Sequence, residues 1–309
     1  MSADGHSGLT QSRRALRFVL AFTAIYFCWG SSFLATRVGV RDLPPFLFGA
    51  ARFICAGVIM LCVARLRRQR VAPRPEEWLQ LAVPATFGFL IANGVGVWTM
   101  QFVTSGKSAL LNTIAPCWLV LLGSFGARAH RPGRLAVAGI VAGGCGAVLL
   151  IEPWESSARA ALWPQLLILF GCLAWSINSI YQRNNISRLP VAAMIGWQML
   201  MGGLMLGALG LAAGEVARWH WQWRSLLPLS YLVIFASCIA HTAYAWLAPR
   251  TTPTSLGTYA YVNPAIATVL GWLVLDETLS VAQGAGMMLV LVSVMLINWS
   301  ERLSAEPAT

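Results

Sequence analysis

Charged residues are scarce in this chain. Of its 309 residues only 11% are charged, whereas 57% are hydrophobic, and just 11 side chains are acidic against 22 basic ones. Soluble domains carry about 25% charged residues, because these residues cover a surface that faces water. So few charges exclude a soluble globular protein.

Motifs of enzymes and metal sites are also absent. The sequence contains no HExxH, GxSxG or P-loop pattern and no paired carboxylates within an apolar segment. We therefore expect no enzyme activity, no cofactor and no ATP-driven pumping by this chain. Its seven cysteines form no CxxC pair and all lie in apolar segments, which favours a packing role over a metal site or a disulfide framework.

The chain instead contains long segments without charged residues. Ten segments are 17 residues or longer, and one of them is broken only by Arg52. About 20 apolar residues cross a bilayer as a helix. The pattern predicts an all-α integral membrane protein with ten transmembrane helices. The segments are 18–36, 43–64, 78–106, 108–127, 135–151, 160–182, 189–214, 225–249, 251–275 and 278–300.

Basic residues alternate in density between these segments. Fifteen of the 22 precede the first segment or follow an even-numbered one, and six lie on the opposite side of the membrane. Cytoplasmic loops are enriched in Lys and Arg, so both termini are expected in the cytoplasm. A nucleic-acid-binding protein would gather its basic residues on one accessible face. We predict the lipid bilayer, and no nucleic acid, as the partner of these charges.

The chain repeats itself after about 150 residues, with five predicted helices in each half. Because five is odd, the second half must enter the membrane from the opposite side. Inverted repeats place a binding site near the membrane midplane and let a carrier open to either side in turn. The pairs that carry the repeat, at offsets of 145 to 148, are Trp29 with Trp175, Pro45 with Pro190, Trp98 with Trp246, and Pro116 with Pro264.

Short motifs add a family resemblance. The first half contains CWGSSF (28–33), LPP (43–45) and ARF (51–53), and the second contains TYAYVNP (258–264) and ETLS (277–280). Over residues 18 to 298 the chain resembles the drug/metabolite transporter superfamily, and more specifically its ten-helix EamA-type exporters. The resemblance implies repeats at 18–152 and 160–299 between cytoplasmic tails at 1–17 and 300–309. It also implies a bacterial-type inner membrane and export of amino acids, other metabolites or drugs.

Polar and aromatic side chains inside the predicted helices are the candidate substrate-binding residues. A polar group buried in lipid needs a partner or a wet cavity, so these side chains should face inward. Each aromatic residue could equally pack helices, and the asparagines near prolines could satisfy freed backbone carbonyls. The candidates are Tyr26, Trp29, Arg52, Asn93, Trp98, Asn112, Trp175, Asn178, His241, Tyr244, Tyr259, Tyr261 and Asn263.

Arg52 is the most informative of these residues. A centrally placed arginine costs about 2.5–3.5 kcal/mol on insertion scales, and no acidic residue lies deep in a predicted helix. Arg52 should therefore either snorkel to the interface or meet carbonyls, tyrosine hydroxyls or a substrate carboxylate. Lys107, the single lysine, is expected at the interface. His241 is either a satisfied core histidine or a proton site.

Pro116 and Pro264 fall at symmetric positions within predicted helices four and nine. Proline removes a backbone hydrogen bond and kinks a helix. The pair therefore predicts either two gating hinges or two static bends.

These features predict an exporter of small metabolites that works by alternating access. Amino acids and related zwitterionic or carboxylated solutes are the leading substrates, moved largely down their gradient, since Arg52 would attract a carboxylate and repel a cation. The alternatives are an exporter of hydrophobic or cationic drugs coupled to a proton gradient, and a membrane interaction protein without transport. The exporter is expected to be a monomer, with a homodimer as the second possibility.

The charge pattern gives a test of topology. Cysteines that replace Arg70 and Trp221 should be labelled by an impermeant reagent from opposite sides of the membrane, with Arg70 cytoplasmic. Labelling of both from the same side would contradict the count of ten helices and the inverted repeat.

Overall fold

Every regular element among the described residues is a helix. The structure, a computed structural model, describes residues 4–125, 132–155, 162–185, 187–220, 222–247, 250–251, 253–256 and 258–305. The first half holds α1 (Asp4–Asp42), α2 (Pro45–Leu66), η1 (Pro75–Glu77), α3 (Trp78–Pro84), η2 (Ala85–Asn93), α4 (Gly94–Thr99), α5 (Ser105–Asn112), α6 (Ala115–Gly123) and α7 (Arg134–Ile151). The second holds α9 (Leu162–Asn184), α10 (Val191–Ala212), η3 (Glu215–Arg218), α11 (Trp223–Tyr231), η4 (Leu232–Ile239), α12 (Ala240–Leu247), α13 (Pro253–Leu256), α14 (Tyr259–Leu275) and α15 (Val281–Ala305).

These elements make the ten predicted transmembrane helices. Helix three runs from η1 through α4, helix four joins α5 and α6, helix eight runs from α11 through α12, and helix nine is α14. In the described part of the chain, nine helical stretches are long and apolar enough to cross a membrane. Helix nine, with 17 residues, is slightly shorter. The prediction of ten apolar helices is confirmed.

Prolines set the start of two of these helices. Pro45 occupies the first turn of α2, and Pro190 immediately precedes α10. Proline suits the first turn because the N–H that it lacks has no partner there. The repeat seen in the sequence at this pair therefore marks the beginning of helix two in one half and of helix seven in the other.

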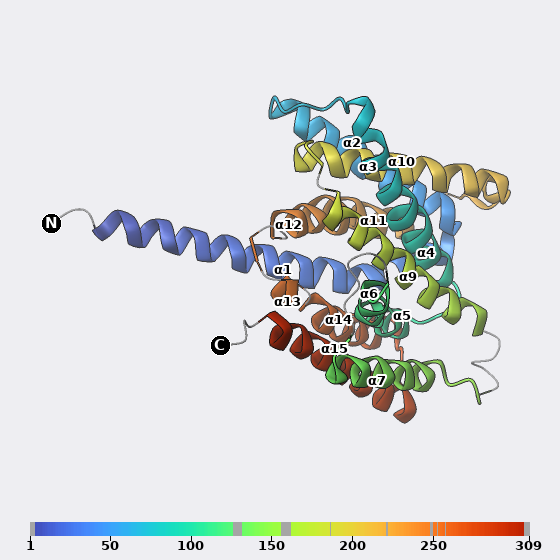
Figure 1. Cartoon of the computed structure of the whole chain (residues 1–309). Coiled ribbons are helices and arrows are strands. Elements are labelled where there is room, and N and C mark those ends of the chain that lie inside the picture. The colour runs from blue at the N-terminus through green and yellow to red at the C-terminus, as the bar shows by residue number, and fades with distance from the viewer. Residues whose placement is uncertain are drawn as a thin grey trace.

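The two halves pack crosswise. Helix two (α2) packs against its counterpart helix seven (α10), and helix five (α7) packs against its counterpart helix ten (α15). These two pairs lie at the top and the bottom of Figure 1, with α1 between them. Helix one contacts helices eight and nine, while its counterpart helix six contacts helices three and four. Such reciprocal contacts are those of two inverted repeats related by a pseudo-two-fold axis.

The outer helices extend beyond the predicted repeat boundaries. Helix α1 begins at Asp4 and α15 runs to Ala305, so most of both predicted tails is helical, while residues 1–3 and 306–309 lie outside the described residues. The beginning of α1 and the end of α15 both lie on the left of Figure 1. We call the side opposite to them, formed by the loops that precede the even-numbered helices, the distal face.

The two symmetric prolines lie in different surroundings. Helix four is interrupted at Thr113 and Ile114, and Pro116 begins the next segment in the first turn of α6. Pro264 instead lies within an unbroken α14 as its sixth residue, where it removes one hydrogen bond, to Ala260. A break therefore accompanies only the first proline of this pair, and the hinge role of both remains a prediction.

Glycines allow the paired helices to approach closely. A Cβ atom on Gly146 of α7 would lie 2.9 Å from the carbonyl oxygen of Gly286 and 2.7 Å from Cγ2 of Val290, both in α15. Apolar side chains gain little by leaving lipid for another helix, so small residues that permit backbone contact drive such pairing.

Replacement of Gly146 by alanine should lower the midpoint of thermal unfolding in detergent, because overpacking costs about 1–3 kcal/mol. Gly144→Ala, two residues away on the same helix, is the matched control, since its Cβ would meet nothing within 4 Å. The control should unfold at or slightly above the wild-type midpoint, because alanine favours a helix by about 1 kcal/mol over glycine. Equal midpoints for both variants would contradict the close approach of α7 and α15.

Candidate functional site

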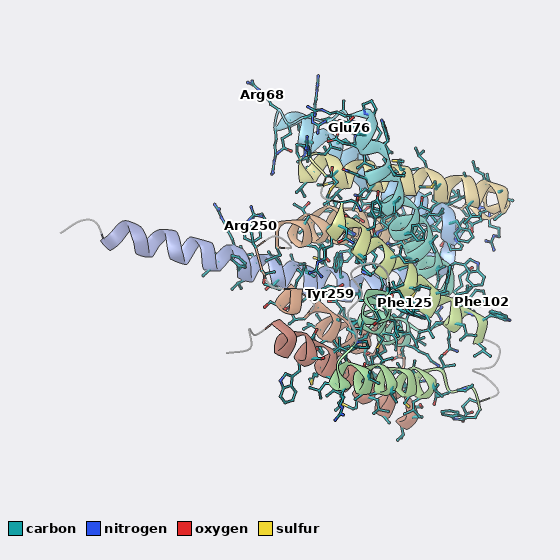
Figure 2. All side chains as sticks on the ribbon, in the orientation of Figure 1. Arg68, Glu76, Phe102, Phe125, Arg250 and Tyr259 are labelled. Carbon is teal, nitrogen blue, oxygen red and sulfur yellow. The ribbon has the colours of Figure 1, made fainter. Side chains whose placement is uncertain are left out.

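Aromatic rings from three helices meet around Trp29. Its ring centroid lies 5.2 Å from that of His241, 5.4 Å from that of Tyr244 and 5.4 Å from that of Tyr259. Trp29 belongs to α1 in the first half, and the other three belong to α12 and α14 in the second. Figure 2 places Tyr259 in the middle of the molecule, whereas Arg68 and Phe102 lie near its edges. We call this group the aromatic cluster.

Two more predicted residues join the aromatic cluster. The side chain of Trp175, the repeat counterpart of Trp29, is a hydrogen-bond partner of Tyr259. Tyr26 forms a hydrogen bond of 2.5 Å with the hydroxyl of Thr258 and packs among the same side chains. The cluster thus contains one tryptophan from each half, as the repeat predicts for a site between the halves.

Arg52 lies beside the aromatic cluster and does not snorkel. It is 5% exposed, its Nε donates a hydrogen bond of 2.9 Å to the hydroxyl of Ser237, and its guanidinium lies 4.7 Å from the ring centroid of Phe53. Phe89 links the two groups, with its ring 5.0 Å from Phe53 and 5.7 Å from His241. Among the described residues no carboxylate forms an ion pair with Arg52.

A short π-helix occupies the same place in each half. These segments are η2 in helix three and η4 in helix eight, about 147 residues apart. A π-helix leaves backbone groups without their usual partners and is frequent at functional sites. In η4 the carbonyl oxygen of Ala236 accepts hydrogen bonds from Trp29 Nε1 at 3.1 Å and His241 Nδ1 at 3.0 Å.

Two predicted asparagines lie at the other π-helix. Asn93 donates a hydrogen bond of 2.7 Å to the carbonyl oxygen of Gly88, and Asn178 of α9 packs directly over Gly88. Asn178 also accepts a hydrogen bond of 2.9 Å from Gln182. These residues hold helix three against helix six and do not join the aromatic cluster.

The other predicted residues are dispersed. Trp98 packs on Phe102, Asn112 donates to the carbonyl oxygen of Ser108, and Tyr261 accepts a hydrogen bond from Asn298. Asn263 is buried next to Gly30, and its Oδ1 has no hydrogen-bond partner among the described residues.

Carboxylates tie the helices together at the distal face. Glu277 accepts hydrogen bonds from Ser105 N at 3.0 Å and Ser105 Oγ at 2.7 Å at the start of α5. Glu215 accepts from Leu47 N at 2.8 Å at the start of α2. In each case a residue of the second half satisfies a helix N-terminus of the first, where the free N–H groups and the helix dipole favour an anion.

Glu152 and Lys107 form a third contact at this face. Glu152 accepts hydrogen bonds from Ser280 and Gln283 at the start of α15, and its Oε2 lies 3.9 Å from Lys107 Nζ. Lys107 lies near the distal end of helix four, and its placement at the membrane interface stays a prediction. The lysine is 8% exposed and faces a carboxylate, because helix five ends beside the start of helix four.

Comparison with known proteins agrees with this arrangement. The EamA-like transporter family matches residues 16–152 and 162–299, one match to each half. The chain belongs to this family. This chain is 31% identical to the uncharacterized inner membrane transporter YedA of Escherichia coli K12, with 94% of each chain covered. It is 20% identical to the uncharacterized transporter YoaV of Bacillus subtilis, with 91% of this chain and 96% of YoaV covered.

A solved structure supports the fold of this transporter. The crystal structure of a protein matches with a TM-score of 0.66 at 20% identity, and the match covers 94% of this chain and 99% of that protein. The relatives carry names of membrane transporters, including bacterial inner membrane ones. The chain is accordingly a multi-pass membrane transporter.

Several contacts of this EamA-like transporter had no signal in its sequence. Ser237 and Phe89, which connect Arg52 to the aromatic cluster, are ordinary helix residues with no motif around them. The π-helices also left no signal in the sequence, because a shift of the backbone hydrogen bonds by one residue leaves no pattern in composition. The carboxylates at the distal face were predicted at helix ends, yet their partners on other helices depend on the packing.

The contact of Glu277 with α5 predicts a loss of stability on neutralisation. In Glu277→Gln the amide group faces backbone donors with a donor of its own, so the free energy of unfolding should fall by about 1–2 kcal/mol. Asp276→Asn removes the same charge from the exposed neighbouring residue and keeps a side chain that tolerates its left-handed backbone. Thermal unfolding of both in detergent measures the difference, and equal midpoints would contradict the capping role.

Proposed function

We propose that this transporter exports small carboxylated or zwitterionic solutes, with amino acids as the leading class, by alternating access between its halves. The observation that carries the proposal is Arg52, a buried guanidinium without a carboxylate partner among the described residues. A buried charge is costly unless it is paired, so a substrate carboxylate that reached Arg52 would recover part of this cost.

The chemistry of arginine supports a carboxylate as the ligand. The guanidinium offers five N–H donors in a planar fork that matches a carboxylate. Its Nε is held by Ser237, and the adjoining rings of Phe53 and Phe89 exclude water, which strengthens the attraction. A cationic solute would be repelled by the same charge.

The aromatic cluster supplies the rest of such a site. Trp29, Tyr244 and Tyr259 present apolar ring surfaces, and binding sites for small organic molecules combine such surfaces with a few polar groups. The cluster joins helix one to helices eight and nine. A shift between the halves would therefore change the shape of the site and its access.

The direction of transport follows from the proposed orientation. With both termini in the cytoplasm of a bacterial-type inner membrane, the carboxylate contacts of Glu277, Glu215 and Glu152 would lie at the outer face and help to keep it closed. Opening of that face after the substrate has bound from the cytoplasm would give export.

Replacement of Arg52 by glutamine tests the proposal in proteoliposomes. Loss of a charge-assisted contact should reduce amino-acid flux about tenfold or more, the equivalent of about 1.4 kcal/mol. An uncharged analogue with the same side chain, such as the N-acetyl amide, should lose much less. Arg65→Gln, at the exposed end of the same helix, is the matched control and should behave as wild type.

Two results would contradict this substrate class. One is unchanged amino-acid flux through the Arg52→Gln variant. The other is uphill export of a quaternary ammonium compound by the wild-type protein when a proton gradient is the sole energy source, which would favour the drug exporter.

A further inference from the structure

The imidazole of His241 is held in one tautomer by the backbone. The carbonyl oxygens of Ala236 and Ser237 lie beside the ring, and Nδ1 is hydrogen-bonded to that of Ala236 at 3.0 Å. A carbonyl oxygen can only accept a hydrogen bond, so Nδ1 carries the hydrogen. In a neutral imidazole the other nitrogen, Nε2, is then an acceptor.

The first half of the chain shows that this contact does not require a histidine. Asn93 lies 148 positions before His241 and donates to the carbonyl oxygen of Gly88, five residues earlier, just as His241 donates to Ala236. Gly88 and Ala236 are themselves 148 positions apart, so the two contacts are repeat counterparts. An asparagine can therefore make this contact, and its remaining acceptor, Oδ1, lies close to its own backbone. The longer imidazole places its acceptor, Nε2, further from the helix, and this reach is what the second half gains.

His241 stands where this extra acceptor can meet a ligand. Its ring contacts those of Trp29 and Phe89, and His241 is one helical turn from Ser237, the hydrogen-bond partner of Arg52. The charge of Arg52 acts on His241, and a second buried positive charge beside it would be costly, which favours the neutral ring. Tyr26, Tyr244 and Tyr259 are the other titratable groups of this cluster.

We infer that Nε2 of His241 accepts a hydrogen bond from the ammonium group of the substrate while Arg52 binds its carboxylate. This inference rests on the proposed function and narrows it from carboxylated solutes in general to α-amino acids. An ammonium group has only donors, so it pairs with a neutral acceptor and not with Arg52. The ammonium group of a zwitterion would thus meet the acceptor of His241, and its carboxylate would meet Arg52. Ser237, which holds Arg52, is one helical turn from His241.

The test is a ratio of fluxes in proteoliposomes. The two probes are an α-amino acid and its des-amino analogue, which keeps the side chain and the carboxylate. The wild-type protein should prefer the amino acid. His241→Asn keeps a donor for Ala236, as Asn93 does for Gly88, but replaces Nε2 with an acceptor that lies closer to the helix. It should lower this preference about tenfold with the flux of the analogue retained.

Two further variants separate binding from structure. His241→Ala removes the backbone contact as well and should lose the same preference along with stability, seen as a lower midpoint of thermal unfolding. Asn93→Ala removes the counterpart contact in the first half and should leave the flux ratio at the wild-type value, whatever the absolute flux.

The outcomes distinguish this inference from the proposed function. A wild-type flux ratio in His241→Asn would overturn the inference, because the histidine would then serve only to satisfy the π-helix. Equal wild-type transport of both probes would overturn it too, while leaving a carboxylate transporter. Failure of the wild-type protein to move either probe would overturn the proposed function and the inference together.

Discussion

In a bilayer, every backbone N–H and C=O group must find its partner inside the protein, and this constraint governs the whole structure. Within a regular helix these groups bond to one another. The groups that need other partners are therefore those at helix ends and at irregular turns. At the distal face, Glu215 and Glu277 satisfy the starts of helices two and four. Inside, Asn93 and His241 donate to carbonyl oxygens of the two π-helices. At the distal face these side chains come from other helices, which ties the helices to one another.

The inverted repeat gives these contacts two related settings that differ in chemistry. Helices two and seven, and helices five and ten, pack as counterparts, so the scaffold is nearly symmetric. The side chains on this scaffold are not symmetric. Asn93 in one half corresponds to His241 in the other, and an acceptor nitrogen is thereby introduced in one half alone. Substrate recognition can therefore be asymmetric on a scaffold whose packing allows either face to open.

Arg52 connects the energetics of folding with the proposed transport. Its guanidinium is buried with a serine hydroxyl and aromatic rings around it, an arrangement that leaves its charge without a counterion among the described residues. A protein that keeps such a group loses stability unless function requires it. Lys107, by contrast, faces Glu152.

The sequence by itself determined the membrane class, the ten helices, the two repeats and the family, because hydropathy and the offsets of Trp29 and Trp175 follow the linear chain. It also named most of the aromatic cluster, since polar and aromatic residues in lipid must face inward. Tertiary structure alone decided which of those residues meet, that Ser237 holds Arg52, and that Lys107 faces Glu152. It also decided where the two π-helices form. These features depend on the rotation and depth of each helix against its neighbours, and a one-dimensional pattern contains neither.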